Sequence, residues 1–268
     1  MRKVVEFYNK FDKKLIDDYV LGNRRIESAI INLSKFIPVE STNILDIGCG
    51  LGWSSHEFAK NFPAAKIEGV DLSPVLIDTA SKLFDLQNLT YQVYDLTKSL
   101  PKTTYDAVVM IDVYEHVQKH ERKKFHESLR FLLKKQGRLI LACPSKYHQT
   151  WLKETNPAGL QPIDEDVDFM VIADLAQGIN GEIIFFEYQK IWRSYDYFYA
   201  VIEIHPVYNA ISPVKTNTKI KLEETFEKIY RAKERLGLDY EKAKIQTTKK
   251  LSRKLVNKIL KTLRKKKS

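Results

Sequence analysis

The sequence predicts an α/β fold with a doubly wound, mostly parallel sheet, and three observations support this prediction. Apolar runs that suit strands alternate with amphipathic helical stretches from residue 43 to residue 142. The first run leads directly into a turn with glycines at positions 48, 50 and 52. Residues 105–111 form a run that is apolar except for Asp106, as expected of a strand that is covered on both faces. Strands and helices that alternate at this rhythm predict right-handed crossovers.

The composition suits one large domain with extensions. The chain has 268 residues, of which 44% are hydrophobic, and this is enough for a real core. It contains no run of about 18 apolar residues, and its first residues lack the apolar centre of a signal peptide. Its two cysteines, Cys49 and Cys143, offer no disulfide framework. We therefore expect a cytoplasmic protein in a reducing compartment.

The positive charge is concentrated near the C-terminus. The formal net charge is +10, but residues 242–268 hold 12 Lys or Arg and no Asp or Glu, which leaves −2 for the remainder. A basic groove for DNA or RNA is therefore not implied, and nucleic acid is not an expected partner. Residues 249–267 place apolar side chains on one helical face with lysines around them. This pattern suits peripheral binding to the inner face of a membrane, and equally a solvated tail or a partner protein.

Two helices are expected before the first strand. Residues 5–20 are rich in Tyr and Phe, and residues 24–36 carry apolar side chains at helical spacing. Pro38 should end the second helix. The chain then divides into an N-terminal helical lid over residues 1–40, a central domain over 41–206 and a helical extension with a basic tail over 207–268.

The elements of the central domain follow in order. Helices are expected at residues 54–61, after Ser73-Pro74, at 122–135 and from Asp164 to about 176, and strands at 66–71, 89–94, 137–142, 182–188 and 197–204. Ser73 suits a helix N-cap, and Gly137 marks a turn between helix and strand. Residues 144–163 are expected to form a long loop. Residues 219–237 predict a helix that leaves the sheet, either as an extension or as a homodimer contact.

The glycine spacing indicates which ligand the turn suits. A dinucleotide-binding turn reads Gly-x-Gly-x-x-Gly and requires a glycine at position 53, where this chain has Trp53. Asp46 places a negative charge before the turn, which would repel a pyrophosphate but not a sulfonium. Asp71 ends the second strand about 20 residues after the glycines, where a carboxylate can bind both ribose hydroxyls of a nucleoside. The alternative for Asp71 is a carboxylate that only caps the next helix.

An acid followed by alternating glycines resembles the first motif of the class I S-adenosylmethionine (SAM) dependent methyltransferases, and the resemblance covers about residues 43–145. It implies a seven-stranded sheet with an antiparallel last strand, SAM as cofactor and S-adenosylhomocysteine as product. It also implies an N-terminal lid over the cofactor, although the lid tyrosines can equally be packing residues. The expected cofactor-binding residues are Asp46, Gly48, Cys49, Gly50, Gly52, Asp71, Leu72, Asp95, Leu96, Asp112, Tyr8 and Tyr19.

His116 is the expected catalytic base, because it follows the fourth strand and histidine titrates near neutral pH. The pair Glu115-His116 resembles a Glu-His pair in quinone and fatty-acyl methyltransferases. In many of their relatives, however, this histidine packs beneath the cofactor and catalyses nothing. Glu115 and Tyr114 are the weaker catalytic candidates. The other histidines lack metal-ligand spacing, so no metal is expected.

The acceptor is less well defined than the cofactor. Enzymes that methylate base or amide nitrogens carry Asp/Asn-Pro-Pro-aromatic after the fourth strand, where this chain has Asp112-Val113-Tyr114. Cys143 is better explained as a small buried residue than as a nucleophile. We expect O- or N-methylation of a small molecule, with a sugar or lipid-linked glycan precursor favoured by resemblance to bacterial methyltransferases of cell-surface polysaccharide pathways. The alternatives are a quinone or lipid precursor, or a non-catalytic SAM-binding scaffold tethered by its tail to membrane or nucleic acid.

Overall fold

The structure is a computed structural model that describes residues 7–9, 11–95, 101–207 and 220–240. The predicted cofactor residue Leu96 and the predicted membrane-binding segment, residues 249–267, lie outside these described residues. None of the helices in the described ranges combines the length and the apolar character that crossing a bilayer requires.

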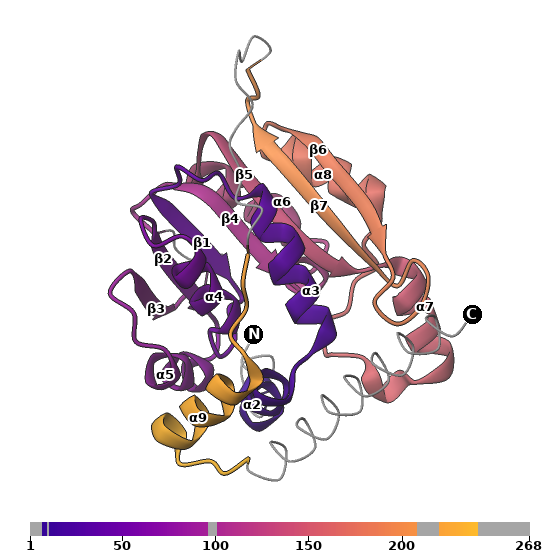
Figure 1. Ribbon diagram of the computed structural model, residues 1–268. Helices are drawn as coiled ribbons and strands as arrows, with labels where there is room; N and C mark the ends of the chain where they lie inside the picture. Colours follow the sequence, from indigo (N-terminus) through magenta and orange to yellow (C-terminus); the bar gives the residue numbers. More distant parts are fainter. Residues whose placement is uncertain (1–6, 10, 96–100, 208–219, 241–268) are drawn as a thin grey trace, which may run out of the picture.

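A single mixed sheet of seven strands forms the centre of the described structure (Figure 1). The strands are β1 (Asn43–Ile47), β2 (Lys66–Asp71), β3 (Leu89–Val93), β4 (Tyr105–Ile111), β5 (Leu133–Pro144), β6 (Gly181–Gln189) and β7 (Tyr197–Ile204). Their order is β3-β2-β1-β4-β5-β7-β6, and β7 runs antiparallel to both of its neighbours. The predicted fold class, including the antiparallel last strand, is confirmed. Because β1 to β5 are parallel, their carboxyl ends meet at one edge of the sheet.

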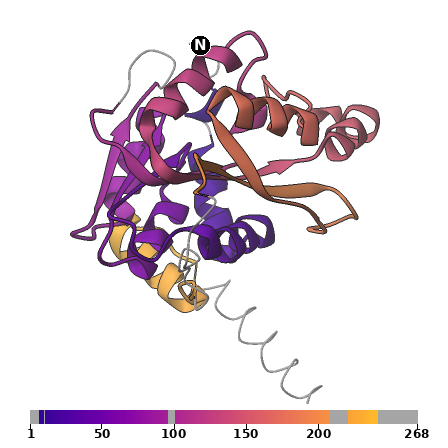
Figure 2. The same ribbon diagram turned by 90° about the horizontal axis from the view of Figure 1, so that it is seen from above.

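Helices cover both faces of the sheet, as Figure 2 shows. They are α2 (Asp12–Leu21), α3 (Arg24–Leu33), α4 (Trp53–Asn61), α5 (Pro74–Leu83), α6 (Arg122–Leu132), α7 (Lys146–Thr155), α8 (Phe169–Gly178) and α9 (Thr225–Leu236), with short 3₁₀ turns at Ser34–Phe36, Tyr114–His116 and Pro157–Gly159. Alternate residues of each strand point to opposite faces, so Ile44 belongs to the core beneath α3 and α4, and Leu45 to the core beneath α6 and α8. This two-sided burial explains the apolar character of β4.

Two helix predictions need correction. The segment predicted as a long loop contains α7, which Ser145 caps by accepting a hydrogen bond from the backbone N–H of His148. This helix has only one buried side chain, so its sequence lacks the apolar stripe that marks a core-facing helix. Helix α8 begins later than expected, because Asp168 accepts the hydrogen bonds of its first turn and the acids at 164–166 lie outside it.

The connection between α6 and β5 also differs in detail. Helix α6 ends at Leu132 rather than near residue 135, and β5 begins at once. The pairing register of β4 and β5 then shifts between Leu133 and Arg138. Gln136 takes a positive φ of 64°, and a side chain at Gly137 would meet the carbonyl of Lys134. The predicted turn at Gly137 therefore exists, but as an irregularity within a strand rather than as a boundary.

Helix α9 packs beside α2 and α5, as Figure 1 shows in yellow. The buried Glu223, just before it, accepts hydrogen bonds from the Tyr19 hydroxyl (2.6 Å) and from Arg231 (2.6 Å). Lys228 is also buried, with its ammonium 4.3 Å from the centre of the Trp53 ring. These contacts join α9 to α2 and to the start of α4, so α9 helps to hold α2 in place.

Candidate active site

The glycine turn after β1 has the geometry that its sequence predicts. Gly48, Gly50 and Gly52 have φ angles of 67°, 55° and 86°, which residues with a β-carbon rarely adopt. A β-carbon on Gly48 would also lie 2.5 Å from a methyl group of Val113 in the chain that follows β4. The turn can therefore approach the end of β4 only because Gly48 lacks a β-carbon.

Asp71 is held at the end of β2 by the neighbouring backbone. One carboxylate oxygen accepts a hydrogen bond from the N–H of Gly50 (2.9 Å), and the other accepts one from the N–H of Ser73 (2.8 Å). Burial raises the pKa of Asp71, while these backbone hydrogen bonds act in the opposite direction. Each oxygen keeps a lone pair, so the fixed carboxylate can still accept bonds from two hydroxyl groups.

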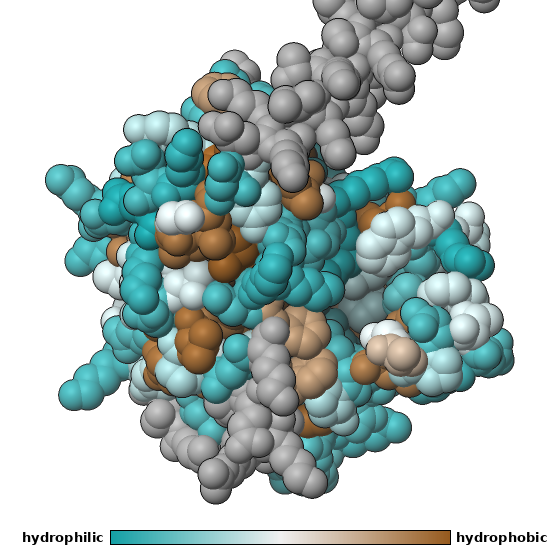
Figure 3. All heavy atoms as spheres, turned by 90° about the horizontal axis from the view of Figure 1, so that it is seen from below, coloured by the Kyte–Doolittle hydropathy of each residue, from teal (hydrophilic) through white to brown (hydrophobic). Residues whose placement is uncertain are grey.

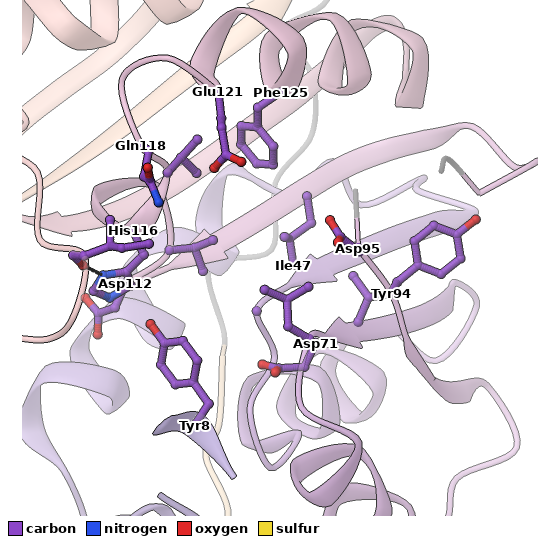
Figure 4. Close-up of a pocket in the computed structure, with 16 residues that line it drawn as sticks. Tyr8, Ile47, Asp71, Tyr94, Asp95, Asp112, His116, Gln118, Glu121 and Phe125 are labelled. Atoms are coloured by element: carbon purple, nitrogen blue, oxygen red, sulfur yellow. Dashed lines mark hydrogen bonds between the residues drawn. The ribbon is translucent and has the colours of Figure 1, made fainter. Parts of the chain in front are cut away.

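Three adjoining cavities run along the carboxyl edge of the sheet. Residues that border them in turn are Leu72, Asp95 and Phe125 for the first cavity, Cys49, Gly50 and Arg25 for the second, and Gln149, Trp192 and Tyr197 for the third. The first and second cavities share Tyr8, Gly48, Asp71, Asp112 and His116, and the second and third share Phe11, Lys14, Arg25 and Gln161. Figure 4 shows the first cavity, with Asp71 and Asp95 on one side and Asp112 and His116 on the other.

Asp46 lies outside the three cavities, although it was predicted to bind the cofactor. It is buried and accepts hydrogen bonds of 2.6 Å from both Ser54 and Ser55 in the first turn of α4. Burial is the largest cause that raises its pKa, to about 6. The structure therefore gives Asp46 the task of attaching α4 to the end of β1. Gly52, which is also predicted to bind the cofactor, borders none of the three cavities either and is the N-cap of α4.

His116 is fixed in one tautomer at the wall between the first and second cavities. Its Nδ1 lies 2.6 Å from the carbonyl oxygen of Ile163, which can only accept, so Nδ1 carries the proton. The other nitrogen, Nε2, then has a free lone pair. Burial lowers the pKa of His116, so the neutral form prevails at pH 7. A neutral imidazole with an unprotonated Nε2 is the state that a general base requires.

Two acids lie beside His116. Asp164 Oδ1 is 3.3 Å from Nδ1, and Glu115 Oε1 is 3.7 Å from Nε2. Burial is the main cause that raises the pKa of Glu115 to about 8, so this side chain is mostly protonated at neutral pH. Of the two acids, Asp164 is therefore the one that can stabilise a proton gained by His116.

The three predicted tyrosines have different positions. Tyr8 borders the first and second cavities, and its ring lies 6.2 Å from that of His116. Tyr19 is fully buried between Trp53 and Phe84, and its hydroxyl bonds to Glu223, which favours the packing role over cofactor contact. The Tyr114 hydroxyl lies 2.7 Å from Nε2 of His126 in the core beneath α6. Tyr114 is therefore buried in the core and borders none of the three cavities, in contrast to the catalytic role predicted for it.

Arg25 is a site residue that the sequence did not indicate. Its guanidinium pairs with the Asp112 carboxylate and donates a hydrogen bond to the Tyr197 hydroxyl (3.2 Å). Asp112 has a positive φ of 57°, an unusual conformation for a residue with a side chain. Arg25 borders both the second and the third cavity, because α3 crosses the sheet near β5 and β7. An arginine on an amphipathic helix carries no local signal for such a role.

The fold and the site together define a nucleoside-binding enzyme of the doubly wound type, and the comparisons identify its family. Residues 44–137 match the family described as a methyltransferase domain. This match covers the glycine turn, Asp71, Asp95, Asp112 and His116. The chain is a class I SAM-dependent methyltransferase.

Relatives with assigned activities are consistent with this family. The chain is 28% identical to malonyl-[acyl-carrier protein] O-methyltransferase 2 of Ilyobacter polytropus, over 68% of this chain and 70% of the relative. It is 31% identical to a ubiquinone biosynthesis O-methyltransferase of Coxiella burnetii, over 45% of this chain and 51% of the relative. The magnesium protoporphyrin IX methyltransferase of Synechocystis PCC 6803, solved with bound S-adenosylhomocysteine, shares the fold at a TM-score of 0.57 and 19% identity, covering 76% and 98% of the two chains.

The residues of the first two cavities suit SAM, which is the cofactor of this enzyme. The Asp71 carboxylate can hold the ribose hydroxyls, and the apolar side chains of Leu72 and Phe125 can cover the adenine. The glycine turn and Arg25 border the second cavity, where the methionine part would lie. Among the described residues, no group of three His, Cys, Asp or Glu side chains is arranged to hold a metal ion.

Proposed function

We propose that this methyltransferase acts on a hydroxyl oxygen of a small-molecule acceptor, with His116 as the general base. The observation that carries this proposal is the hydrogen bond from His116 Nδ1 to the Ile163 carbonyl, because it leaves Nε2 unprotonated at the wall of the cofactor cavities. A hydroxyl group is a weak nucleophile until its proton is removed, so a positioned base matters more for O-methylation than for N-methylation.

SAM supplies an activated methyl group on a sulfonium when it is bound. The sulfonium would give its methyl group to the acceptor oxygen and leave as S-adenosylhomocysteine, while His116 Nε2 would accept the hydroxyl proton. The imidazolium produced in this way faces Asp164, whose carboxylate lies 3.3 Å from Nδ1. Since the acid is already in place, it stabilises the charge without a rearrangement of the site.

The favoured acceptor is a sugar or a lipid-linked glycan precursor, and the alternative is a quinone or lipid precursor. The names of the two relatives, both O-methyltransferases, support oxygen as the methylated atom. Methyl-labelled SAM incubated with the enzyme and fractionated cell extract separates the two acceptor classes. Label in water-soluble or lipid-linked saccharides supports the first, and label in quinone or other glycan-free lipid fractions supports the second.

Absence of label from every fraction, in protein that binds SAM, would favour the scaffold hypothesis over an enzyme with this acceptor range.

We further propose that the basic tail tethers the enzyme to anionic membranes. Removal of residues 242–268 should then abolish sedimentation with phosphatidylglycerol vesicles and leave the activity in solution unchanged. Salt-sensitive RNA binding that disappears with the tail would instead point to a nucleic-acid tether.

A further inference from the structure

The third cavity shares Arg25 and Gln161 with the second and takes most of its other walls from segments outside the first two cavities. These segments include Gln149 of α7, and Trp192 and Tyr197 near the β6–β7 hairpin. Figure 3 shows this face of the molecule hollowed to the right of centre, on the side where Figure 1 places α7. The third cavity adjoins the second through Arg25 and Gln161, so a molecule bound there can reach toward His116.

Two side-chain amides in this cavity have unused hydrogen-bonding capacity. Gln149 is only 1% exposed, and its Oε1 has no hydrogen-bond partner among the described residues. The buried Oε1 of Gln161 is likewise unpartnered within the described part of the chain. A buried polar atom without a partner costs about 1–3 kcal/mol, so such atoms usually mark a place for a ligand or water. Whichever way each amide is turned, a hydroxyl group can bond it, because hydroxyls both donate and accept.

An aromatic wall stands beside the two amides. The ring of His148 lies 5.8 Å from Trp192 and 6.1 Å from Tyr197, and Trp192 and Tyr197 are 6.0 Å apart. The Trp192 side chain remains 54% exposed, so much of its surface is free to contact a bound molecule. Aromatic faces pack well against the C–H faces of saturated rings and against flat aromatic rings. The rings alone therefore fit both a sugar and a quinone.

Most of the charges around the third cavity are paired. Arg25 pairs with Asp112 and Lys14 with Asp18 at 3.4 Å, and the remaining charge is Asp164 beside the neutral His116. Glu115 is mostly neutral at pH 7, since burial raises its pKa to about 8. A strongly anionic or cationic acceptor would have to break one of these pairs, whereas a neutral acceptor would not.

We propose that the third cavity is the acceptor subsite and that it takes a neutral, hydroxyl-rich ring such as a sugar unit, with Gln149 and Gln161 bonding its hydroxyls and Trp192 packing on its face. A quinone ring would use the aromatic wall but would leave the amides without hydroxyl partners. This assignment rests on the proposed function, since it assumes methyl transfer to a hydroxyl of the bound ring. Binding at this subsite can nevertheless be measured without turnover.

The test is saturation-transfer difference NMR of the full chain, with and without S-adenosylhomocysteine. The probes are the methyl glycosides of glucose, galactose, mannose, rhamnose and N-acetylglucosamine, and catechol and 2,6-dimethoxyphenol as flat competitors. Gln149→Leu and Gln161→Leu remove one amide each, and Gln177→Leu on the exposed face of α8 is the matched control. We expect signal in the ring protons of at least one glycoside, reduced at least fivefold by either cavity substitution and unchanged in the control.

Signal from the phenols alone, or from neither set of probes, would overturn the assignment, as would a glycoside signal that ignores both substitutions. Thermal unfolding of each variant shows whether a lost signal reflects a lost fold. Gln149→Glu, which keeps the shape and an acceptor oxygen but loses the N–H donor, gives a second variant that should retain part of the signal. Failure of the proposed function has a different result. If the protein binds glycosides in this amide-dependent way but does not bind S-adenosylhomocysteine, the acceptor subsite is supported and the proposed methyl transfer is refuted.

Discussion

The cofactor half and the acceptor half of the site are built in different ways. The first two cavities are formed largely at the ends of β1, β2, β3 and β4, each followed by a short segment that carries the side chains concerned. The third cavity takes its walls from α3, α7, the segment around Gln161 and the β6–β7 hairpin. The first and the last of these elements lie more than 100 residues apart in the sequence. The cofactor half therefore depends on local chain geometry, and the acceptor half on how distant elements pack.

This difference suggests which half can change without loss of the fold. The glycine turn and Asp71 are tied to the sheet by backbone hydrogen bonds, so a change there disturbs the parallel strands. Trp192 and His148 border the third cavity, outside the parallel strands. Their replacement should therefore alter mainly the surface that the acceptor contacts. Substitutions in each half test this separation.

His116→Ala should reduce kcat by about 100-fold to 10,000-fold, because it removes the general base, while the Kd for SAM changes less than about threefold. The wild-type rate should fall on acidification with a midpoint below the ordinary histidine pKa of about 6.5, since burial lowers the pKa of His116 and only the neutral form accepts a proton. A pH profile of kcat tests both statements.

His120→Ala, on an exposed histidine four residues later, is the control for this experiment and should behave as wild type. Equal turnover in His116→Ala and wild type would make His116 a packing residue.

Asp71→Ala should weaken SAM binding by about 100-fold, because two charge-assisted hydrogen bonds to the ribose are lost and each contributes about 1.5 kcal/mol. Isothermal titration calorimetry measures the change. Asp71 also anchors Gly50 and Ser73, so the fold of the variant is checked by thermal unfolding. Asp85→Ala, at an exposed position after α5, serves as control. SAM affinity that survives the loss of this carboxylate would show that Asp71 only caps the next helix.

Trp192→Ala should raise the KM for the acceptor by about tenfold through the loss of ring contact, with kcat and SAM affinity nearly unchanged. Steady-state kinetics with the acceptor identified from labelled extracts gives these constants. Tyr230→Ala, which removes an exposed aromatic ring on α9, is the matched control. A parallel rise in the Kd for SAM would show that the two halves of the site are not separable.

Asp46→Asn should leave SAM affinity within about threefold of wild type, because Asp46 borders none of the three cavities. It should raise the stability of the protein at pH 8 by about 3 kcal/mol, and have little effect at pH 4. The folded pKa of about 6 lies above the ordinary value, so ionisation of the buried carboxyl costs stability as the pH rises through 6. Thermal unfolding at the two pH values measures this difference, and stability that rises equally at both would contradict the assignment.

Particular residues show how far the sequence predicts the site. The positions of Gly48, Asp71, Asp95, Asp112 and His116 follow from motifs at strand ends, and the structure brings all five to the first cavity. Tyr19 and Tyr114 have the same aromatic side chain as Tyr8, yet each is buried in packing and only Tyr8 borders the site. Sequence spacing alone does not show which face of a helix or turn lies against the cavity, because this depends on how each element packs on the sheet.

Strand periodicity and turn chemistry are local properties that each segment carries with it, so the sequence predicts the sheet, the glycine turn and the class of cofactor. In contrast, the folded arrangement is needed to see that Arg25, Gln149, Gln161 and Trp192 border one cavity next to His116. These residues come from elements that meet through long-range packing, and no short stretch of the chain encodes their distance from one another. The physical reason is that local sequence fixes backbone conformation, whereas the shape of a cavity is set by the contacts between elements.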